Sequence, residues 1–262
     1  MRQRGEANLM KLRQLLWQRV QRGKLIKPVL WIPLWMWGQS SVIEPLPHSL
    51  AVSPFLHSYG WGLGVFVQSW KGPRWGTYWM GDLTSYRTKY EARTRSAYRD
   101  QGGKDYVFGK VYYAYLAELL WGYQYIVAQR MSHTPLQMSI QAGIGPAFAF
   151  LKPYYIEVAV PISANQAIIQ IDTYDPNRHS YTDIVGEADF YLGFDRIQAV
   201  PGAVFQTGVL VDVGKDPSVI RSLAIGGRLQ AFVRPIQTLY QRPGRSVWVS
   251  GYLAFYIGNA WK

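Results

Sequence analysis

The sequence predicts an all-β fold, a closed antiparallel transmembrane β-barrel of eight strands. Three observations support it: segments whose polarity alternates residue by residue, abundant tryptophan and tyrosine, and connections that are alternately short and long. The chain has 262 residues, of which 11 are Trp and 19 are Tyr. These side chains favour the boundary between lipid and water. The sequence has no uninterrupted run of 18 apolar residues, which argues against a helical membrane protein.

The final segment, residues 246–261, shows the alternation most clearly. Its odd positions are mainly apolar, as at Val247, Phe255 and Ile257, and most of its even positions are polar, amphipathic or small. Trp248 is the exception, because it is bulky and apolar on the even face. A tilted strand of about 9–11 residues spans a bilayer, and an aromatic C-terminus suits the last strand of an outer-membrane barrel. The alternative is the last strand of a soluble barrel or sandwich.

Seven earlier segments complete the predicted barrel. They are residues 49–57, 60–70, 74–85, 107–131, 136–162, 205–213 and 223–233. The first is the weakest because Pro54 lacks a ladder donor, but an even number of strands requires it. The segment 107–131 is kept as one strand that projects beyond the bilayer, because a break at Glu118 would disturb the order of the connections.

The connections alternate in length. Short turns are predicted at 71–73, 132–135 and 215–217, and long loops at 86–105, 164–198 and 235–244. Outer-membrane barrels have tight turns on the periplasmic side and long loops outside. A soluble lipocalin-like barrel is the main structural alternative, but it would carry charge on its outside and its apolar face inside.

The face opposite the apolar one predicts the content of the barrel interior. It carries Gly, Gln, Ser, Tyr and a few isolated charges. Four charged residues on it are candidate lumen partners: Asp82, Arg130, Asp212 and Arg228. Side chains can fill the interior of an eight-stranded barrel, so a wide diffusion pore is not expected.

The N-terminal segment has the pattern of an export signal. Residues 1–38 carry eight basic residues and one acidic residue, followed within the segment by an apolar run at 28–37, and translation starts at Met1 or Met10. We therefore expect a signal peptide at 1–38, a barrel domain at 39–262, and an integral protein of the bacterial outer membrane in contact with its lipid. The other 20 basic and 15 acidic residues form no basic stripe, which argues against nucleic acid as a partner.

The candidate residues for catalysis or cation binding lie in one loop cluster. Asp172, Asp175, His179 and Asp183 lie close together in the sequence. Carboxylates beside a histidine could act in acid–base catalysis or bind a hard cation, whereas Asp- and Pro-rich composition also arises from turn formation alone. The chain has no cysteine. We assign no catalytic, cofactor-binding or metal-binding residue and expect no cofactor.

Several short motifs resemble those of a protein family. They are residues 57–64 (HSYGWGLG), 108–110 (FGK), 150–155 (FLKPYY), 174–179 (YDPNRH), 193–195 (GFD), 201–202 (PG) and 256–261 (YIGNAW). Together they resemble a conserved, uncharacterised outer-membrane β-barrel family of Bacteroidota, over about residues 57–262. The resemblance implies a location and a fold, and it brings no catalytic residues. The chain departs from the family at residues 84–89, where members have a basic patch.

The functional expectation is a non-enzymatic outer-membrane barrel. We expect an accessory or scaffold subunit of an envelope assembly or protein-secretion machine, with other envelope proteins as partners, because the lumen is expected to be filled and the loops are long. Two alternatives stay open. A rim enzyme acting on lipid or peptide would place His179 or His133 beside a carboxylate or serine, and a narrow channel would conduct small solutes.

Overall fold

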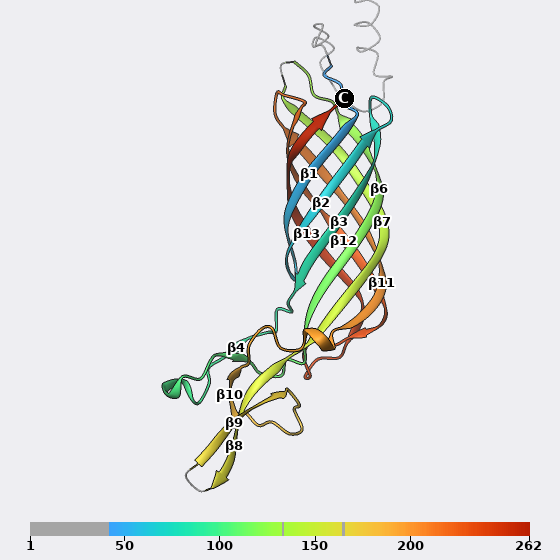
Figure 1. Cartoon of the computed structure of the whole chain (residues 1–262). Coiled ribbons are helices and arrows are strands. Elements are labelled where there is room, and N and C mark those ends of the chain that lie inside the picture. Colours follow the sequence, from blue (N-terminus) through green and yellow to red (C-terminus); the bar gives the residue numbers. More distant parts are fainter. Residues whose placement is uncertain (1–41, 133, 164–165) are drawn as a thin grey trace, which may run out of the picture. The chain divides into compact units, whose positions relative to one another are not determined.

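The computed structural model describes residues 42–262 except 133 and 164–165, so the signal peptide predicted at 1–38 lies outside the described residues. Eight strands form a closed barrel in the order β1-β13-β12-β11-β7-β6-β3-β2 (Figure 1). Their bounds are β1 His48–His57, β2 Gly60–Trp70, β3 Trp75–Tyr86, β6 Tyr112–Ala128, β7 Leu136–Pro153, β11 Gln198–Val213, β12 Val219–Ile236 and β13 Arg245–Trp261.

Closure is made by β1, which pairs antiparallel with the second strand on one side and the last strand on the other. His48 faces Ser69 of β2 and Trp261 of β13. All other neighbours in the ring are also antiparallel. The ring therefore has no unpaired sheet edge along its paired length, as a strand in lipid requires. The predicted eight-stranded antiparallel barrel is confirmed.

Proline in β1 does not interrupt closure. Pro54 keeps its place opposite Leu63 of β2, but the pairing with β13 skips from Val52 to Phe55. A residue without an N–H is tolerated where the ladder lacks a bond. The weakest of the predicted strands is therefore a complete member of the barrel.

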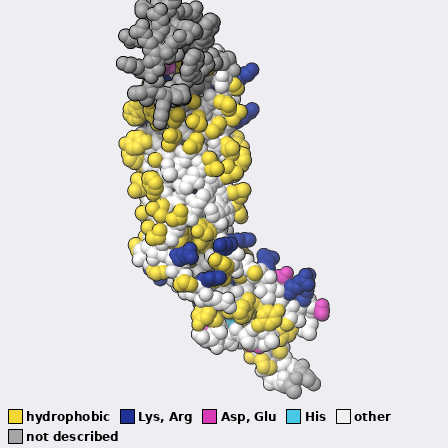
Figure 2. Space-filling view, turned by 180° about the vertical axis from the view of Figure 1, so that it is seen from behind, with side chains coloured by type: hydrophobic (Ala, Val, Ile, Leu, Met, Phe, Trp, Pro, Cys, Tyr) yellow, Lys and Arg dark blue, Asp and Glu magenta, His cyan; other side chains and the backbone are white. Residues whose placement is uncertain are grey.

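The outer wall of the barrel is apolar. Large hydrophobic side chains point outward from every strand; examples are Leu83, Ile225 and Ile257, which are 66%, 64% and 64% exposed. Figure 2 shows hydrophobic side chains distributed along the barrel wall on the face in view, around a central area of backbone and other side chains. A soluble barrel would lose free energy by exposing such a surface, whereas a bilayer covers it. This exterior rules out the lipocalin-like alternative.

The strands are long enough to cross a membrane. They have between 10 and 18 residues, against the ~9–11 that a tilted spanning strand needs. Among the described residues, no helix has the length and hydrophobicity to cross a membrane. With its apolar wall and polar interior, the chain is an integral outer-membrane β-barrel.

The rim at the loop end is stepped. The neighbouring strands β1, β2 and β3 have 10, 11 and 12 residues, whereas the other five have 16 to 18. β13 extends beyond the end of β1 at this rim. There the tight β1–β2 turn provides hydrogen-bond donors to backbone carbonyls of β13. The Ser58 N–H donates to the carbonyl of Gly251, and the Tyr59 hydroxyl donates to the carbonyl of Val249, at 3.0 Å each.

Several predicted boundaries are wrong. The strand predicted at 107–131 is β6, which begins at Tyr112 and ends at Ala128, and the strand predicted at 205–213 is β11, which begins at Gln198. Residues 136–162 are not one strand, because β7 ends at Pro153 and the chain leaves the barrel. The next strand, β8 (Tyr155–Ser163), pairs with β9 (Gln166–Thr173) and β10 (Ile184–Glu187) in a separate three-stranded sheet. The predicted loop 164–198 therefore contains two strands. Period-two alternation persists across the break and cannot reveal which sheet a strand joins.

The long loops share a core of their own. Tyr154, which separates β7 from β8, is fully buried, and its hydroxyl accepts the N–H of Val107 at 3.0 Å. Val107 belongs to β5 (Tyr106–Val107), which pairs with β4 (Arg93–Thr94) in the preceding loop. The buried cluster consists of Tyr106, Tyr154, Ile156, Val158, Tyr174 and Ile184. Two loops distant in sequence are thus packed together.

Glycine pairs inside the barrel give a test of the fold. A Cβ on Gly226 would overlap the Thr207 carbonyl and lie 2.7 Å from the Gly208 Cα, whereas on Gly227 its nearest neighbour would be 3.8 Å away. We expect Gly226→Ala to destabilise the barrel by about 1–3 kcal/mol through overpacking. Gly227→Ala, on the opposite face, should leave stability nearly unchanged. Urea unfolding in detergent micelles measures both, and equal midpoints would contradict the packing of this face.

Candidate functional site

The centre of the lumen holds a buried cation between two carboxylates. The guanidinium of Arg228 donates to Asp82 from Nη2 and to Glu118 from Nη1, at 2.8 Å each, and its Nε donates to Gln206 at 2.7 Å. The side chains of Arg228, Asp82 and Glu118 are 3%, 0% and 0% exposed. The guanidinium also lies 4.6 Å from the ring centroid of Phe55. Four strands, β3, β6, β11 and β12, supply the hydrogen-bonding groups.

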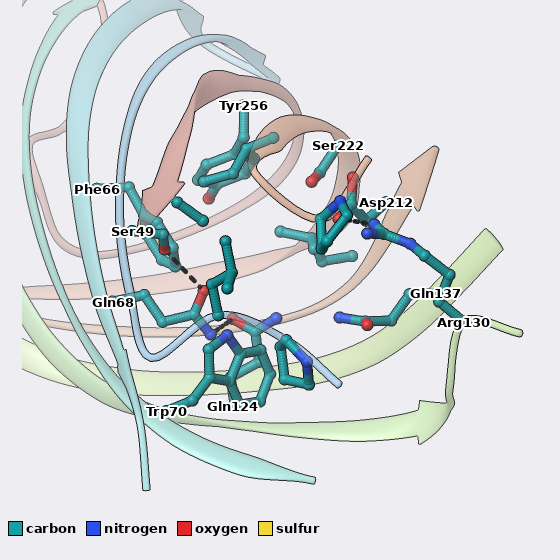
Figure 3. Close-up of a pocket in the computed structure, with 16 residues that line it drawn as sticks. Ser49, Phe66, Gln68, Trp70, Gln124, Arg130, Gln137, Asp212, Ser222 and Tyr256 are labelled. Atoms are coloured by element: carbon teal, nitrogen blue, oxygen red, sulfur yellow. Dashed lines mark hydrogen bonds and ion pairs between the residues drawn. The ribbon is translucent and has the colours of Figure 1, made fainter. Parts of the chain in front are cut away.

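A second ion pair lies toward the short-turn end of the barrel. Arg130 donates from Nη2 to Asp212 at 2.6 Å (Figure 3). Beside it a polar chain runs across four strands: Ser49 donates to Gln68, Gln68 to Gln124, and Gln124 to Ser139. All of these side chains except Ser139 border a cavity of about 40 Å³, which has room for only a few water molecules. The four charged lumen candidates thus form two separate pairs, Arg228–Asp82 and Arg130–Asp212.

Aromatic rings fill the lumen near the loop end. Trp248 points inward, is 3% exposed, and stacks on Tyr86 with ring centroids 4.1 Å apart and an interplanar angle of 17°. Phe232 packs against the same indole at 5.1 Å. The exception to alternation in the last strand is therefore an inward packing residue. Between the two ion pairs, on the short-turn side of Asp82 and Arg228, Tyr78, Met80 and Tyr256 are also fully buried, so side chains continue to fill the lumen toward that end.

Glu118 is a site residue that the sequence reasoning missed. It accepts hydrogen bonds from Arg228 and from the Gln230 amide. The signal is in the sequence, because Glu118 shares its parity along β6 with Gly122 and Gln124, which are residue types typical of the predicted inward face.

The loop cluster is brought together around His179. Its Nε2 lies 3.5 Å from Asp172 Oδ2, and its Nδ1 accepts the backbone N–H of Asp175 at 3.1 Å. The imidazole is 6% exposed. Asp175 also accepts the N–H of Asn177, which forms a local turn. Both ring nitrogens are thus engaged within the loop itself.

Asp183 faces a different set of partners. Its carboxylate accepts the N–H of Ser180 at 3.2 Å and the Ser180 hydroxyl at 2.7 Å. The Ser180 hydroxyl holds the pKa of Asp183 below its usual range. Asp172, Arg178, His179 and Asp183 border a cleft of about 370 Å³. Across the residues with described positions, no three His, Asp or Glu side chains are arranged to hold a metal ion.

A buried lysine ties the loops to the barrel wall. Lys110 Nζ lies 2.6 Å from Glu91 and 4.0 Å from the Tyr113 ring centroid, and the Lys110 and Glu91 side chains are 3% and 6% exposed. Burial lowers the pKa of the Lys110 amine, and Glu91 opposes this shift. Tyr113 in turn donates to Glu187 of β10. This connection between three segments has no counterpart in the sequence-based candidates.

The Arg228 network gives a quantitative test. Arg228→Met leaves Asp82 and Glu118 buried without a counter-charge, and we expect a loss of about 3–5 kcal/mol in the free energy of unfolding. The triple variant Arg228→Met, Asp82→Asn, Glu118→Gln should recover most of that loss, because no unpaired charge remains. Urea titration in detergent micelles measures both. Equal stabilities of the single and triple variants would show that the carboxylates do not depend on Arg228.

Comparison with known proteins identifies similar folds and no family. No family model matches the sequence, and no curated protein matches it. Among solved structures, the chain is similar to Ail, the attachment invasion locus protein of Yersinia pestis, solved in complex with the heparin analogue sucrose octasulfate. The match has a TM-score of 0.37 and 8% identity and covers 83% of this chain and 99% of Ail. It is also similar to Neisserial surface protein A, with a TM-score of 0.36, 11% identity, and coverage of 82% and 96%.

Proposed function

We propose that the chain is a non-enzymatic accessory or scaffold subunit of an envelope assembly or protein-secretion machine, and that it binds a partner protein through strand β9. The observation that supports this proposal is an open, apolar sheet edge in the loops. A lumen packed with side chains makes a transport role less favourable. The Bacteroidota family resemblance is compatible with the proposal and names no activity.

Strand β9 lies at the edge of the loop sheet. The order β10-β8-β9 leaves one side of β9 without a neighbouring strand among the described residues. Its residues 166–171 are all exposed, and Ile168, Ile169 and Ile171 are 50%, 64% and 52% exposed. Natural proteins protect such edges with charge, proline or a covering element. Residues 166–171 contain neither charge nor proline.

The chemistry of this edge defines its partner. An extended segment can add to an open strand through backbone hydrogen bonds, and its alternate side chains then meet those of the host strand. Ile169 and Ile171 lie on one face of β9 and Ile168 on the other, because side chains alternate. We infer a partner segment that is extended and aliphatic, supplied by another envelope protein.

A rim enzyme acting on lipid or peptide is the second candidate. It is favoured by one contact, the 3.5 Å approach of His179 Nε2 to Asp172 beside the 370 Å³ cleft. A hydrolase would also need a nucleophile within reach of the histidine. The Ser180 hydroxyl instead pairs with Asp183 and Thr182. Release of fatty acid or peptide by the purified chain, lost in His179→Ala, would favour the enzyme over the scaffold.

The edge-strand proposal is tested with the double variant Ile169→Lys, Ile171→Lys. Tagged copies are purified from native outer membranes in mild detergent, and co-purifying proteins are quantified by mass spectrometry. We expect the wild type to retain a partner in stoichiometric amount. The double variant should recover at least about tenfold less of that partner, because two charges would be buried in the added sheet.

Tyr191→Lys is the matched control, since Tyr191 is 69% exposed and lies outside β9. It should retain the partner. Folding of each variant is checked by its heat-dependent mobility on electrophoresis. A lone wild-type monomer, or equal recovery with both variants, would overturn the proposal.

Conductance separates the scaffold from a narrow channel. Planar bilayers containing the wild-type chain should show no steady single-channel current, because Tyr78, Met80 and Tyr256 are fully buried across the lumen. Reproducible current steps that change with Arg228→Met would instead assign a channel through the Arg228 network.

A further inference from the structure

A separate cleft opens where the lumen meets the loops. It has a volume of about 440 Å³ and is formed by the β1–β2 turn, the segment after β3 and the β12–β13 loop. Its lining shares no residue with the two lumen ion pairs, with the His179 cluster or with strand β9. The proposed scaffold role does not use it.

Aromatic side chains form the inner surface of this cleft. The stacked pair Tyr86 and Trp248 forms its floor. Tyr59 lies beside them with its ring centroid 5.0 Å from that of Tyr86, and it is only half-buried. Tyr90 also lines the cleft and is 49% exposed. Tyr59 and Tyr90 therefore leave ring surface available to a ligand, above a rigid floor.

Three cations line the same cleft. Lys89, Arg242 and Arg245 are all exposed, and none of them forms an ion pair in the described structure. The Arg242 guanidinium lies 4.0 Å and the Lys89 amine 5.2 Å from the Tyr90 ring centroid, so both cations contact the same ring. Figure 2 shows Lys and Arg side chains gathered where the apolar barrel wall gives way to the loops.

Negative charge is missing from this lining. It contains no Asp or Glu among the described residues. The neighbouring carboxylate, Glu91, is already bound to Lys110 and also accepts the N–H of Thr88. The cleft therefore presents unpaired positive charge beside aromatic rings, with hydroxyl groups of Ser58 and Thr238 also in the lining.

We propose that this cleft binds a phosphorylated saccharide. Arginine and lysine recognise phosphate through charge-assisted hydrogen bonds, and the apolar face of a sugar ring packs on aromatic side chains. The volume lies within the range of small-molecule sites, about 300–1,000 Å³. The same chemistry is offered by a soluble sugar phosphate and by the headgroup of a phosphorylated glycolipid.

The first experiment measures binding to the full chain in detergent micelles by isothermal titration calorimetry. The probes are glucose 1-phosphate, glucose and inorganic phosphate. We expect glucose 1-phosphate to bind more tightly than either of the others. The triple variant Lys89→Gln, Arg242→Gln, Arg245→Gln should weaken it by at least about tenfold, because charge-assisted bonds to phosphate are lost.

A matched control keeps the total charge change the same. Lys71→Gln, Arg74→Gln, Lys215→Gln removes three exposed cations from the turns at the other end of the barrel, and it should bind like the wild type. Tyr90→Leu should weaken glucose 1-phosphate by a larger factor than inorganic phosphate. Equal weakening by both triple variants, or equal affinity for inorganic phosphate and glucose 1-phosphate, would overturn the proposal.

A second experiment distinguishes a soluble sugar phosphate from a lipid headgroup as the ligand. It uses phosphatidylcholine nanodiscs with and without the diphosphorylated glycolipid lipid A. If the ligand is a lipid headgroup, lipid A should suppress the binding of glucose 1-phosphate by the wild type. If the ligand is soluble, glucose 1-phosphate should bind equally in both nanodiscs. Either result supports a phosphosaccharide site. Absence of glucose 1-phosphate binding in micelles and in both nanodiscs would refute it.

Discussion

The size of an eight-stranded ring is the constraint on which the rest of this molecule depends. Backbone groups in lipid must be bonded within the protein, so the strands close on themselves, and eight strands enclose only enough space for side chains. The interior must therefore be filled by groups that are compatible with one another. Arg228 does this by joining Asp82, Glu118 and Gln206, which come from three other strands. A polar lumen thus becomes a cross-linked core.

The same constraint leaves the loops as the surface for the proposed partner binding. The outer wall is committed to lipid and the lumen to internal packing, so neither surface is free for recognition. The loops have an ordered structure of their own. Tyr154 lies in their buried core, and the ion pair between Lys110 and Glu91 joins two of their segments. An ordered loop loses less conformational entropy on binding than a disordered one. This supports recognition by a preformed surface rather than by folding on contact.

Most of the barrel could be predicted from sequence because alternation is a local signal. Segment 60–70 coincides with β2, and the weak segment at 49–57 is β1 within one residue. Two features could not be predicted locally. The exit of the chain after Pro153 leaves the alternation intact, and the pairing of Arg228 with Asp82 joins residues 146 positions apart. Parity placed both residues on the inward face, but only the register between strands decides which carboxylate meets the guanidinium.

The unequal strand lengths have a consequence for how water meets the barrel. Strands β1 to β3 are just long enough to cross a bilayer, whereas β12 and β13 have at least five residues more than any of them. At about 3.3 Å per residue, the five to eight additional residues correspond to roughly 15–25 Å of strand length. At the loop end the barrel wall therefore reaches further on the side of β12 and β13 than on the side of β1 to β3. Anything that reaches the aromatic floor can approach sideways, along the plane of the outer leaflet, as well as from the bulk solution.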